Sequence, residues 1–352
     1  MQNEVKVLGI DVAKNVFQIH GVDASGKEVF RQKLSRAKLK PFMATQSKCL
    51  VGMEACGGAH HWAREFQTLG HEVKLMAPQY VKPYVKRNKN DEADAAAIAE
   101  AVTRPGMNFV AVKEVWQQDI LMVHRVRERL VKQRTALMNE IRGLMQEYGV
   151  VMATGPHRLR QGMVNLLAST NGCLTEMARG ILEQLVTEWR EMDERLATYT
   201  KRLEQMARSH ELCRELDKLP GIGPITATAM VATIGNPRVF RNGRQLAAYL
   251  GLVPRHEGTG GKVRLLGISK RGDRYLRKLL IHGGRALLRH VERRSDRQSR
   301  WALAVINRRG FNKACVAMAN KNARMCWAIM MKCLNGETPT TEAPPRHKTY
   351  AA

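Results

Sequence analysis

Four acidic residues near the start of the chain have types and spacing that suit a metal site. Asp11 directly follows the apolar run of VLGI, and Glu54 directly follows that of LVGM. A carboxylate at the end of a strand can project into a cleft while the strand stays buried. Asp91 and Asp94 are three residues apart in an Ala-rich segment, so on a helix they share one face about a turn apart. Two strand-end acids and such a helix can converge on one point.

Four clustered carboxylates favour a hard divalent cation, Mg²⁺ or Mn²⁺. Such an ion takes oxygen ligands and keeps positions for water and phosphate, and two ions about 3.5 to 4 Å apart can stabilise both oxygens of a phosphodiester displacement. Taken singly, each acid has a structural alternative: a turn for Asp11, a helix entry for Glu54, and an N-cap and first turn for Asp91 and Asp94. The set favours metal binding. A helix turns Glu92 away from this face.

Alternating strand and helix signals predict the framework that positions these acids. Short apolar or alternating runs bounded by turn residues predict strands, and longer periodic segments predict helices. The predicted strands are residues 5–10, 16–20, 27–31, 49–53 and 73–76, and the predicted helices are residues 36–45, 60–69 and 91–102. The order βββαβαβα is typical of an α/β domain with a mixed sheet.

Long charged helices without Gly or Pro follow from about Val115. Apolar residues recur every seven positions, which is the spacing of a coiled-coil seam. The first series is Val123, Leu130, Leu137 and Leu144, and the second is Leu182, Trp189, Leu196 and Leu203 with Leu185, Met192, Tyr199 and Met206. An antiparallel hairpin within one chain and a coiled coil between chains, as in a homodimer or homotetramer, are both consistent with this pattern.

A third region begins near the run LPGIGPITATAM and continues through basic helices to about Leu334. We therefore predict an α/β domain over 1–108, a helical coiled-coil region over 109–212, a mainly helical domain over 213–334, and a disordered tail over 335–352. The tail is rich in Pro, Thr and Glu. The predicted fold class is thus α/β plus all-α.

The third region also holds a candidate hydroxyl and a series of cations. Three glycines surround Thr259, and glycine lets backbone approach phosphate closely. Thr259 is the candidate nucleophile; the alternatives are a hairpin turn in which it only bonds backbone, and Ser269, which is predicted to cap a helix entered near Lys270. The predicted phosphate-binding residues are Lys262, Arg264, Lys270, Arg271, Arg274 and Arg277.

The run PGIGP resembles the hairpin of helix-hairpin-helix modules. Backbone N–H groups near Gly221 and Gly223 would bind phosphate without reading sequence. A short Gly/Pro linker is the alternative explanation of this run.

Composition predicts a nucleic-acid partner. The chain has 58 Lys plus Arg against 32 Asp plus Glu, a formal charge of +26, with a hydrophobic fraction of 44% that favours packed domains over a basic tail. No apolar run approaches the roughly 20 residues that span a bilayer, and the N-terminus lacks the form of a signal peptide. We expect a cytoplasmic protein without a membrane partner. The seven scattered cysteines predict free, mostly structural thiols.

Several motifs together resemble those of one family. GIDVAK, MEACGG and KNDEADA, followed by LPGIGP and LGISKRGDRYLR, are similar to motifs of the insertion-sequence-110 family of transposases, and GISKRGD resembles its 1111 branch. The resemblance runs from about Val7 to Leu334. It implies an N-terminal fold like ribonuclease H and the Holliday-junction resolvase (RuvC-like), with the family's DEDD acids matching Asp11, Glu54, Asp91 and Asp94.

The resemblance also implies a C-terminal transposase domain that supplies a hydroxyl nucleophile. In the family, a serine five residues after the proline of a G-L-x-P-R run attacks DNA and becomes covalently attached to it. Here that proline is Pro254 and the matching residue is Thr259, whose extra methyl crowds an in-line attack. The resemblance further implies a guide noncoding RNA from the same element, which pairs with donor and target DNA.

Three functions are consistent with the sequence. The first is an RNA-guided transposase in which acids and hydroxyl cut and rejoin double-stranded DNA. The second is a metal-dependent nuclease resembling a junction resolvase, which needs the acids but no hydroxyl. The third is a noncatalytic nucleic-acid-binding protein, which needs neither. The sequence favours the first.

Overall fold

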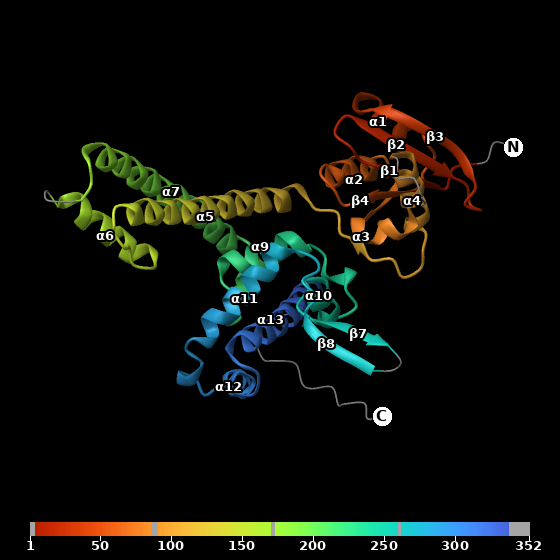
Figure 1. Ribbon diagram of the computed structural model, residues 1–352. Helices are drawn as coiled ribbons and strands as arrows, with labels where there is room; N and C mark the ends of the chain where they lie inside the picture. The colour runs from red at the N-terminus through yellow and green to blue at the C-terminus, as the bar shows by residue number, and fades with distance from the viewer. Residues whose placement is uncertain (1–3, 86–90, 170–172, 260–261, 338–352) are drawn as a thin grey trace. The chain divides into compact units, whose positions relative to one another are not determined.

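The computed structural model describes residues 4–85, 91–169, 173–259 and 262–337 (Figure 1). They form two compact units. One comprises Met1–Val115 with Ile234–Arg241, and the other comprises Trp116–Thr233 with Asn242–Ala352. The boundaries predicted at residues 108, 212 and 334 stay predictions, and most of the predicted tail lies outside the described residues.

The first unit is built on a six-stranded mixed sheet in the order β3-β2-β1-β4-β5-β6. Strands β1, β4 and β5 are parallel, whereas β2, β3 and β6 run antiparallel to their neighbours. The strands are β1 (Val7–Asp11), β2 (Val16–Val22), β3 (Glu28–Ser35), β4 (Leu50–Glu54), β5 (Glu72–Met76) and β6 (Phe109–Val110), and the helices are α1 (Arg36–Thr45), α2 (Ala59–Thr68), α3 (Pro78–Val81), η1 (Lys82–Tyr84) and α4 (Asp91–Val102). The predicted order of elements is confirmed, and α3, η1 and β6 are additional.

Alternating side chains give this sheet two apolar faces, because successive residues of a strand point to opposite sides. On one face Leu8 and Ile10 of β1 pack with Trp62 and Phe66 of α2. The other face carries Val7 and belongs to a separate core with Ile98 and its neighbours in α4. The sheet is therefore covered on both sides. Helix α4 is the long helix that covers the second face.

Three helices form a packed hairpin in the second unit. They are α5 (Val115–Glu147), α6 (Pro156–Ala168) and α7 (Glu176–Ser209). Leu137 and Ile141 of α5 share a core with Leu182 and Trp189 of α7. Half of the second predicted heptad series is buried, namely Leu182, Trp189, Leu196 and Leu203, and the other half, Leu185, Met192, Tyr199 and Met206, is half-buried. The intramolecular alternative therefore occurs in this chain; a coiled coil between chains stays a prediction.

The rest of the second unit consists of helices and a two-stranded β-hairpin, which extends away from them (Figure 1). Helix α11 packs along α13, where a Cβ on Gly284 would lie 2.8 Å from the Cys315 carbonyl oxygen. The elements are α8 (Glu211–Asp217), α9 (Pro224–Ile234), α10 (Gly243–Tyr249), β7 (Pro254–Thr259), β8 (Lys262–Ile268), α11 (Arg274–Leu288), η3 (Val291–Arg293), α12 (Arg297–Arg309) and α13 (Phe311–Leu334). The short helix η2 (Pro237–Val239) lies in the segment Ile234–Arg241 of the first unit. The cysteines are free, as predicted. Among the described residues, no helix is long and apolar enough to cross a bilayer.

A buried histidine joins α5, α9 and α11. His124 is 1% exposed, and its Nε2 and Nδ1 lie 3.1 Å from Thr228 Oγ1 and 3.0 Å from Tyr275 Oη. Thr228 Oγ1 donates to the Pro224 carbonyl at 2.8 Å, so it accepts from Nε2–H while the tyrosine hydroxyl donates to Nδ1. Burial, and secondarily the Arg127 charge, lowers the pKa of His124 to about 4. The imidazole is therefore neutral near pH 7.

This histidine predicts a loss of stability in acid. In the unfolded chain His124 gains its proton near its ordinary pKa of 6.5 and in the folded chain only near 4, so protonation favours unfolding over that window. The free energy of unfolding should fall by up to about 3 kcal/mol from this group between pH 7 and pH 4. Chemical denaturation at several pH values measures this, and His124→Gln should show a shallower dependence. His282→Gln, at an exposed position of α11, is the matched control; an equal change there would contradict the assignment.

Candidate active site

The two strand-end acids lie side by side at the edge of the sheet. Asp11 is the last residue of β1 and Glu54 the last residue of β4. Ile10 is opposite Met53 in this parallel pair, so the acids occupy the next position on strands about 4.8 Å apart. Both are half-buried. The parallel register, which the sequence did not reveal, is what brings them together.

Helix α4 covers the face on which both acids lie. Asp11 shares the face of Gly9, two residues earlier, and Glu54 shares that of Gly52. A Cβ on Gly9 would lie only 2.2 Å from the Ala95 carbonyl oxygen, and one on Gly52 would lie 2.9 Å from Val102 Cβ. The backbone of α4 therefore rests directly on β1, and its Val102 and Ile98 side chains pack on β4.

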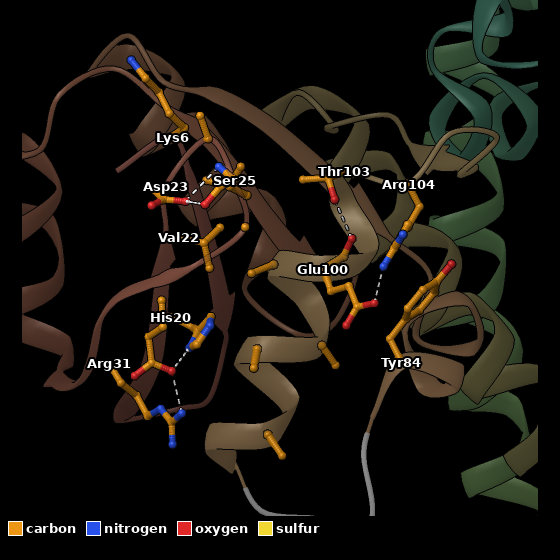
Figure 2. A pocket seen from close by; sticks show the side chains of 18 of the residues that line it. Lys6, His20, Val22, Asp23, Ser25, Arg31, Tyr84, Glu100, Thr103 and Arg104 are labelled. Carbon is orange, nitrogen blue, oxygen red and sulfur yellow. Dashed lines mark hydrogen bonds and ion pairs between the residues drawn. The ribbon is translucent and has the colours of Figure 1, made fainter. Parts of the chain in front are cut away.

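The N-terminal end of α4 lies toward Asp11. Figure 2 shows Thr103 and Arg104, which follow the C-terminal end of α4, at the same end of the pocket as Lys6. Lys6 directly precedes β1. Helix α4 thus runs against the direction of β1. Asp94, which is half-buried, directly precedes the residue that contacts Gly9. Asp91 is the first residue of the helix, and its side chain lies outside the described set.

Cys56 lies close to both Asp11 and Glu54. Its thiol donates to the Val12 carbonyl at 3.5 Å. Burial raises the pKa of Cys56 most, and the negative charges of Asp11 and Glu54 raise it further. Both half-buried carboxylates are therefore neighbours of the same thiol.

The described acids match a hard cation in their chemistry. They offer carboxylate oxygens, which Mg²⁺ and Mn²⁺ prefer. Among the side chains that the structure describes, no group of three His, Cys, Asp or Glu residues stands close enough together to hold an ion as it is. The Asp91 side chain, the predicted fourth ligand, is not among them.

Glu92 points to a different part of the same unit. Its carboxylate lies 3.1 Å from Arg31 of β3, and Arg31 also pairs with Glu28 at 2.7 Å. These residues line the pocket of Figure 2, where Arg104 pairs with Glu100 in the same manner. Each of these two pocket arginines is neutralised by a carboxylate, so the pocket offers little net charge to a phosphate.

The candidate hydroxyl stands at the end of a β-hairpin rather than in an open loop. Thr259 is the last residue of β7 and is paired with Lys262, the first residue of β8. Residues 260–261 lie outside the described set, as do the side chains of Thr259 and Lys262. The acids and the hairpin belong to different units of the chain.

The structure corrects the prediction for Ser269. Helix α11 begins at Arg274 and is capped by Asp273, whose carboxylate accepts from Leu276 N at 2.7 Å. Ser269 precedes this cap by four residues, and its Oγ is buried with no hydrogen-bond partner among the described residues. It is neither a helix cap nor accessible to a substrate.

The predicted phosphate-binding cations divide into two groups. Arg264, Lys270, Arg271 and Arg274 are exposed, as phosphate binding requires. Arg277 is 8% exposed, and its Nη1 donates to the carbonyls of Leu250 at 3.0 Å and Arg271 at 2.7 Å. The structure does not support phosphate binding by Arg277, because its guanidinium is buried and bonded to these two carbonyls.

The two glycines of the PGIGP run also divide into one that is packed within the fold and one with open space beside it. Gly221 has a φ of +84°, and its carbonyl oxygen would lie 1.9 Å from a Cβ on Gly283 of α11. Asn322 of α13 donates to the Pro220 carbonyl at 3.0 Å. Gly221 therefore serves packing within the unit, whereas Gly223 has open space beside it and stays a candidate for phosphate binding.

Comparison with known proteins identifies the family. Residues 8–150 match the model of the DEDD transposase domain of the IS110 family, and residues 213–301 match that of the Transposase IS116/IS110/IS902 family. The chain is 48% identical to the transposase for insertion sequence element IS1111A of Coxiella burnetii, over 94% of this chain and 90% of that one. This chain belongs to the IS110 family of transposases.

Two further relatives agree. The transposase is 46% identical to a probable family 20 transposase of Pseudomonas aeruginosa, over 92% of this chain and 96% of that protein. It is 38% identical to the transposase for insertion sequence element IS1328 of Yersinia enterocolitica, with the same coverage. The first matched region contains all four acids, and its mixed sheet with α4 fits the RuvC-like fold that the resemblance implied. The second contains Thr259.

Close packing at Gly9 predicts a stability effect that tests the placement of α4. Gly9→Ala puts a methyl group against the backbone of Ala95, which a flexible side chain cannot relieve, so the free energy of unfolding should fall by roughly 1 to 3 kcal/mol. Gly57→Ala is the control, because a Cβ there meets nothing within 4 Å. Thermal unfolding of both variants provides the measurement. An unchanged melting temperature for Gly9→Ala would show that α4 does not rest on β1 in this way.

Proposed function

We propose that this transposase cuts and rejoins double-stranded DNA with a divalent metal site at Asp11, Glu54, Asp91 and Asp94 and with Thr259 as the attacking hydroxyl. The observation that carries the proposal is the placement of Asp11 and Glu54 side by side under α4. Strands from separate parts of the chain bring these two carboxylates to one edge. Such an arrangement serves no packing purpose that an apolar pair would not serve better.

The acids would hold Mg²⁺ or Mn²⁺ through their carboxylate oxygens. When bound, the ion would stabilise negative charge on the phosphate oxygens and lower the pKa of a coordinated hydroxyl or water. The chain itself fixes the ligands: the sheet holds Asp11 and Glu54, and the close contact at Gly9 sets the depth at which Asp94 stands. This rigidity matters because ligand geometry decides how a phosphodiester is oriented.

Thr259 would supply the nucleophilic oxygen. Its oxygen forms a bond to the phosphorus of the scissile phosphodiester, the bond from phosphorus to the leaving deoxyribose oxygen breaks, and the proton of the threonine passes to that oxygen through a base or water. A hydroxyl on the joining strand then reverses the step and releases the threonine. Each phosphodiester is exchanged rather than hydrolysed, so no external energy source is required.

The exposed cations Arg264, Lys270, Arg271 and Arg274 would hold the DNA backbone next to the hairpin. Each phosphate contact releases counterions, so affinity should fall steeply with salt. We further propose that a noncoding RNA from the same element guides the transposase and that two or four copies assemble, since joining donor and target duplexes needs several active sites. The support for the RNA is the family resemblance together with the charge of +26, which suits any polyanion.

Substitution of the acids tests the metal site. Asp11→Asn, Glu54→Gln and Asp94→Asn should each lower the rate of DNA strand cutting by on the order of 100-fold or more, because several kcal/mol of charge stabilisation is lost. Gel assays of cleaved and joined products at fixed Mn²⁺ measure this, with DNA affinity measured in parallel. Glu92→Gln is the matched control, since Glu92 pairs with Arg31. Wild-type cutting rates in all three acid variants would exclude these acids as metal ligands. DNA binding without any cutting by the wild-type protein would instead indicate a noncatalytic DNA-binding protein.

Substitution of Thr259 tests the nucleophile. Thr259→Ala should abolish the covalent protein–DNA species while DNA binding persists, and Thr259→Ser should retain the species because it keeps the hydroxyl and removes the crowding methyl. Denaturing electrophoresis of labelled DNA detects the adduct, and peptide mass spectrometry locates it. Joined products at the wild-type rate in Thr259→Ala would exclude this residue. Nicked products without joining, in the wild-type protein, would instead indicate a nuclease.

Sequencing of the RNA that copurifies with the transposase tests the guide. One discrete species transcribed from the element is the expected result. A mixture of cellular RNAs in proportion to their abundance would contradict the guided mechanism and leave the rest of the proposal standing.

A further inference from the structure

The base of the β7–β8 hairpin is built from two loops in direct backbone contact. One loop, residues 250–253, leads into β7, and the other, residues 269–273, leads out of β8. A Cβ on Gly272 would lie 1.9 Å from the Tyr249 carbonyl oxygen, and one on Gly251 would lie 2.4 Å from the Arg271 carbonyl oxygen. Both glycines have positive φ, of +71° and +70°, which other residues adopt only at a cost. The two loops therefore fit together in one arrangement.

Hydrogen bonds extend this contact toward the strands. Ser269 N donates to the Val253 carbonyl at 2.8 Å, and Lys270 N donates to the Gly251 carbonyl at 3.2 Å. Lys270 has a φ of +56°. Among the described residues it is the only non-glycine residue with a positive φ. Strain of this kind persists where the surroundings impose it. A specific contact must therefore hold the second loop against the first.

The Arg277 guanidinium is that contact. Its Nη1 donates to Leu250 O of the first loop region and to Arg271 O of the second, at 3.0 and 2.7 Å. The side chain is buried, and no described carboxylate forms an ion pair with it. A buried cation is costly unless its donors are satisfied, so the two carbonyls and the cation stabilise one another. One nitrogen links the loops before and after the hairpin.

We propose that Arg277 is a positioning residue for the Thr259 hydroxyl. The inference rests on the proposed function: Arg277 does not touch DNA but fixes the base of the hairpin, and thereby the direction in which β7 carries Thr259. Misplacement of a reacting group by about 1 Å can lower a rate on the order of 100-fold. Arg274, one turn earlier on the same helix and exposed, would by contrast contact phosphate directly.

The test compares Arg277→Gln, Arg277→Lys and Arg274→Gln in the full-length chain. For Arg277→Gln we expect the rate of covalent attack at saturating DNA to fall on the order of 100-fold, and the slope of log affinity against log salt to stay unchanged. Arg277→Lys keeps a charged donor and should restore part of the rate. Arg274→Gln should reduce the salt slope by about 0.9, the value for one lost phosphate contact.

Hydrogen exchange supplies a readout that does not depend on activity. The amides of Ser269 and Lys270 should exchange faster in Arg277→Gln, while the core of α5 and α7 keeps its protection. Arg129→Gln, the same charge change at an exposed site on α5, should leave these amides as they are. If Arg277→Gln does not fold, Arg277→Lys is judged by the same two amides.

Each outcome separates the positioning role from the proposed function. A reduced salt slope with unchanged exchange at Ser269 and Lys270 would overturn the inference and make Arg277 a phosphate contact. Local exchange without any change in the rate would overturn it as well, because the loops would then not control the hydroxyl. Absence of a covalent species in the wild-type protein would refute Thr259 as nucleophile, while the exchange and salt measurements would still report whether Arg277 holds the loops.

Discussion

The architecture of the acidic site depends on one steric constraint, the contact between the backbone of α4 and the glycine in the middle of β1. A side chain at Gly9 would overlap the Ala95 carbonyl, so the helix can approach the sheet only because that position has none. The second close contact, at Gly52 of β4, makes the helix span both acid-bearing strands. Alternation along the strands then places Asp11 and Glu54 on the face beneath α4, and the direction of the helix brings its N-terminal acids toward them.

Close backbone contact at glycines recurs in the second unit, at the base of the hairpin whose first strand, β7, ends at Thr259. Gly251 and Gly272 let two loops touch through backbone, and Arg277 ties those loops together. The transposase therefore uses its arginines in two ways. An exposed one such as Arg274 is available to phosphate, whereas Arg277 replaces water around carbonyl groups inside the fold. Net charge describes the partner class but does not distinguish these roles, which depend on the face of α11 that each residue occupies.

Local patterns in the sequence predicted much of this fold because most elements carry their own signals. The Ala-rich segment at residues 91–102 predicted α4 with the observed bounds, and the heptad series of α7 predicted its buried residues. The series of α5 failed at Leu144, which is 41% exposed, because Ile141 and Met145 fill the core there instead.

Strand β6 has only two residues and exists through its pairing with β5. Gly9 and Gly52 did offer a signal, since glycine inside a strand often marks a close backbone approach, but the partner helix could not be read from it. Ser269 and Arg277 were misassigned because their burial depends on loops distant in sequence.

We propose that acids from β1, β4 and α4 hold a catalytic cation together. The most direct measurement is anomalous diffraction from a crystal of the full-length transposase grown with Mn²⁺ and a DNA duplex. An anomalous peak at these acids is the expected result. Mn²⁺ bound elsewhere at saturating concentration, with lysine or arginine side chains paired to these acids in its place, would contradict the proposal.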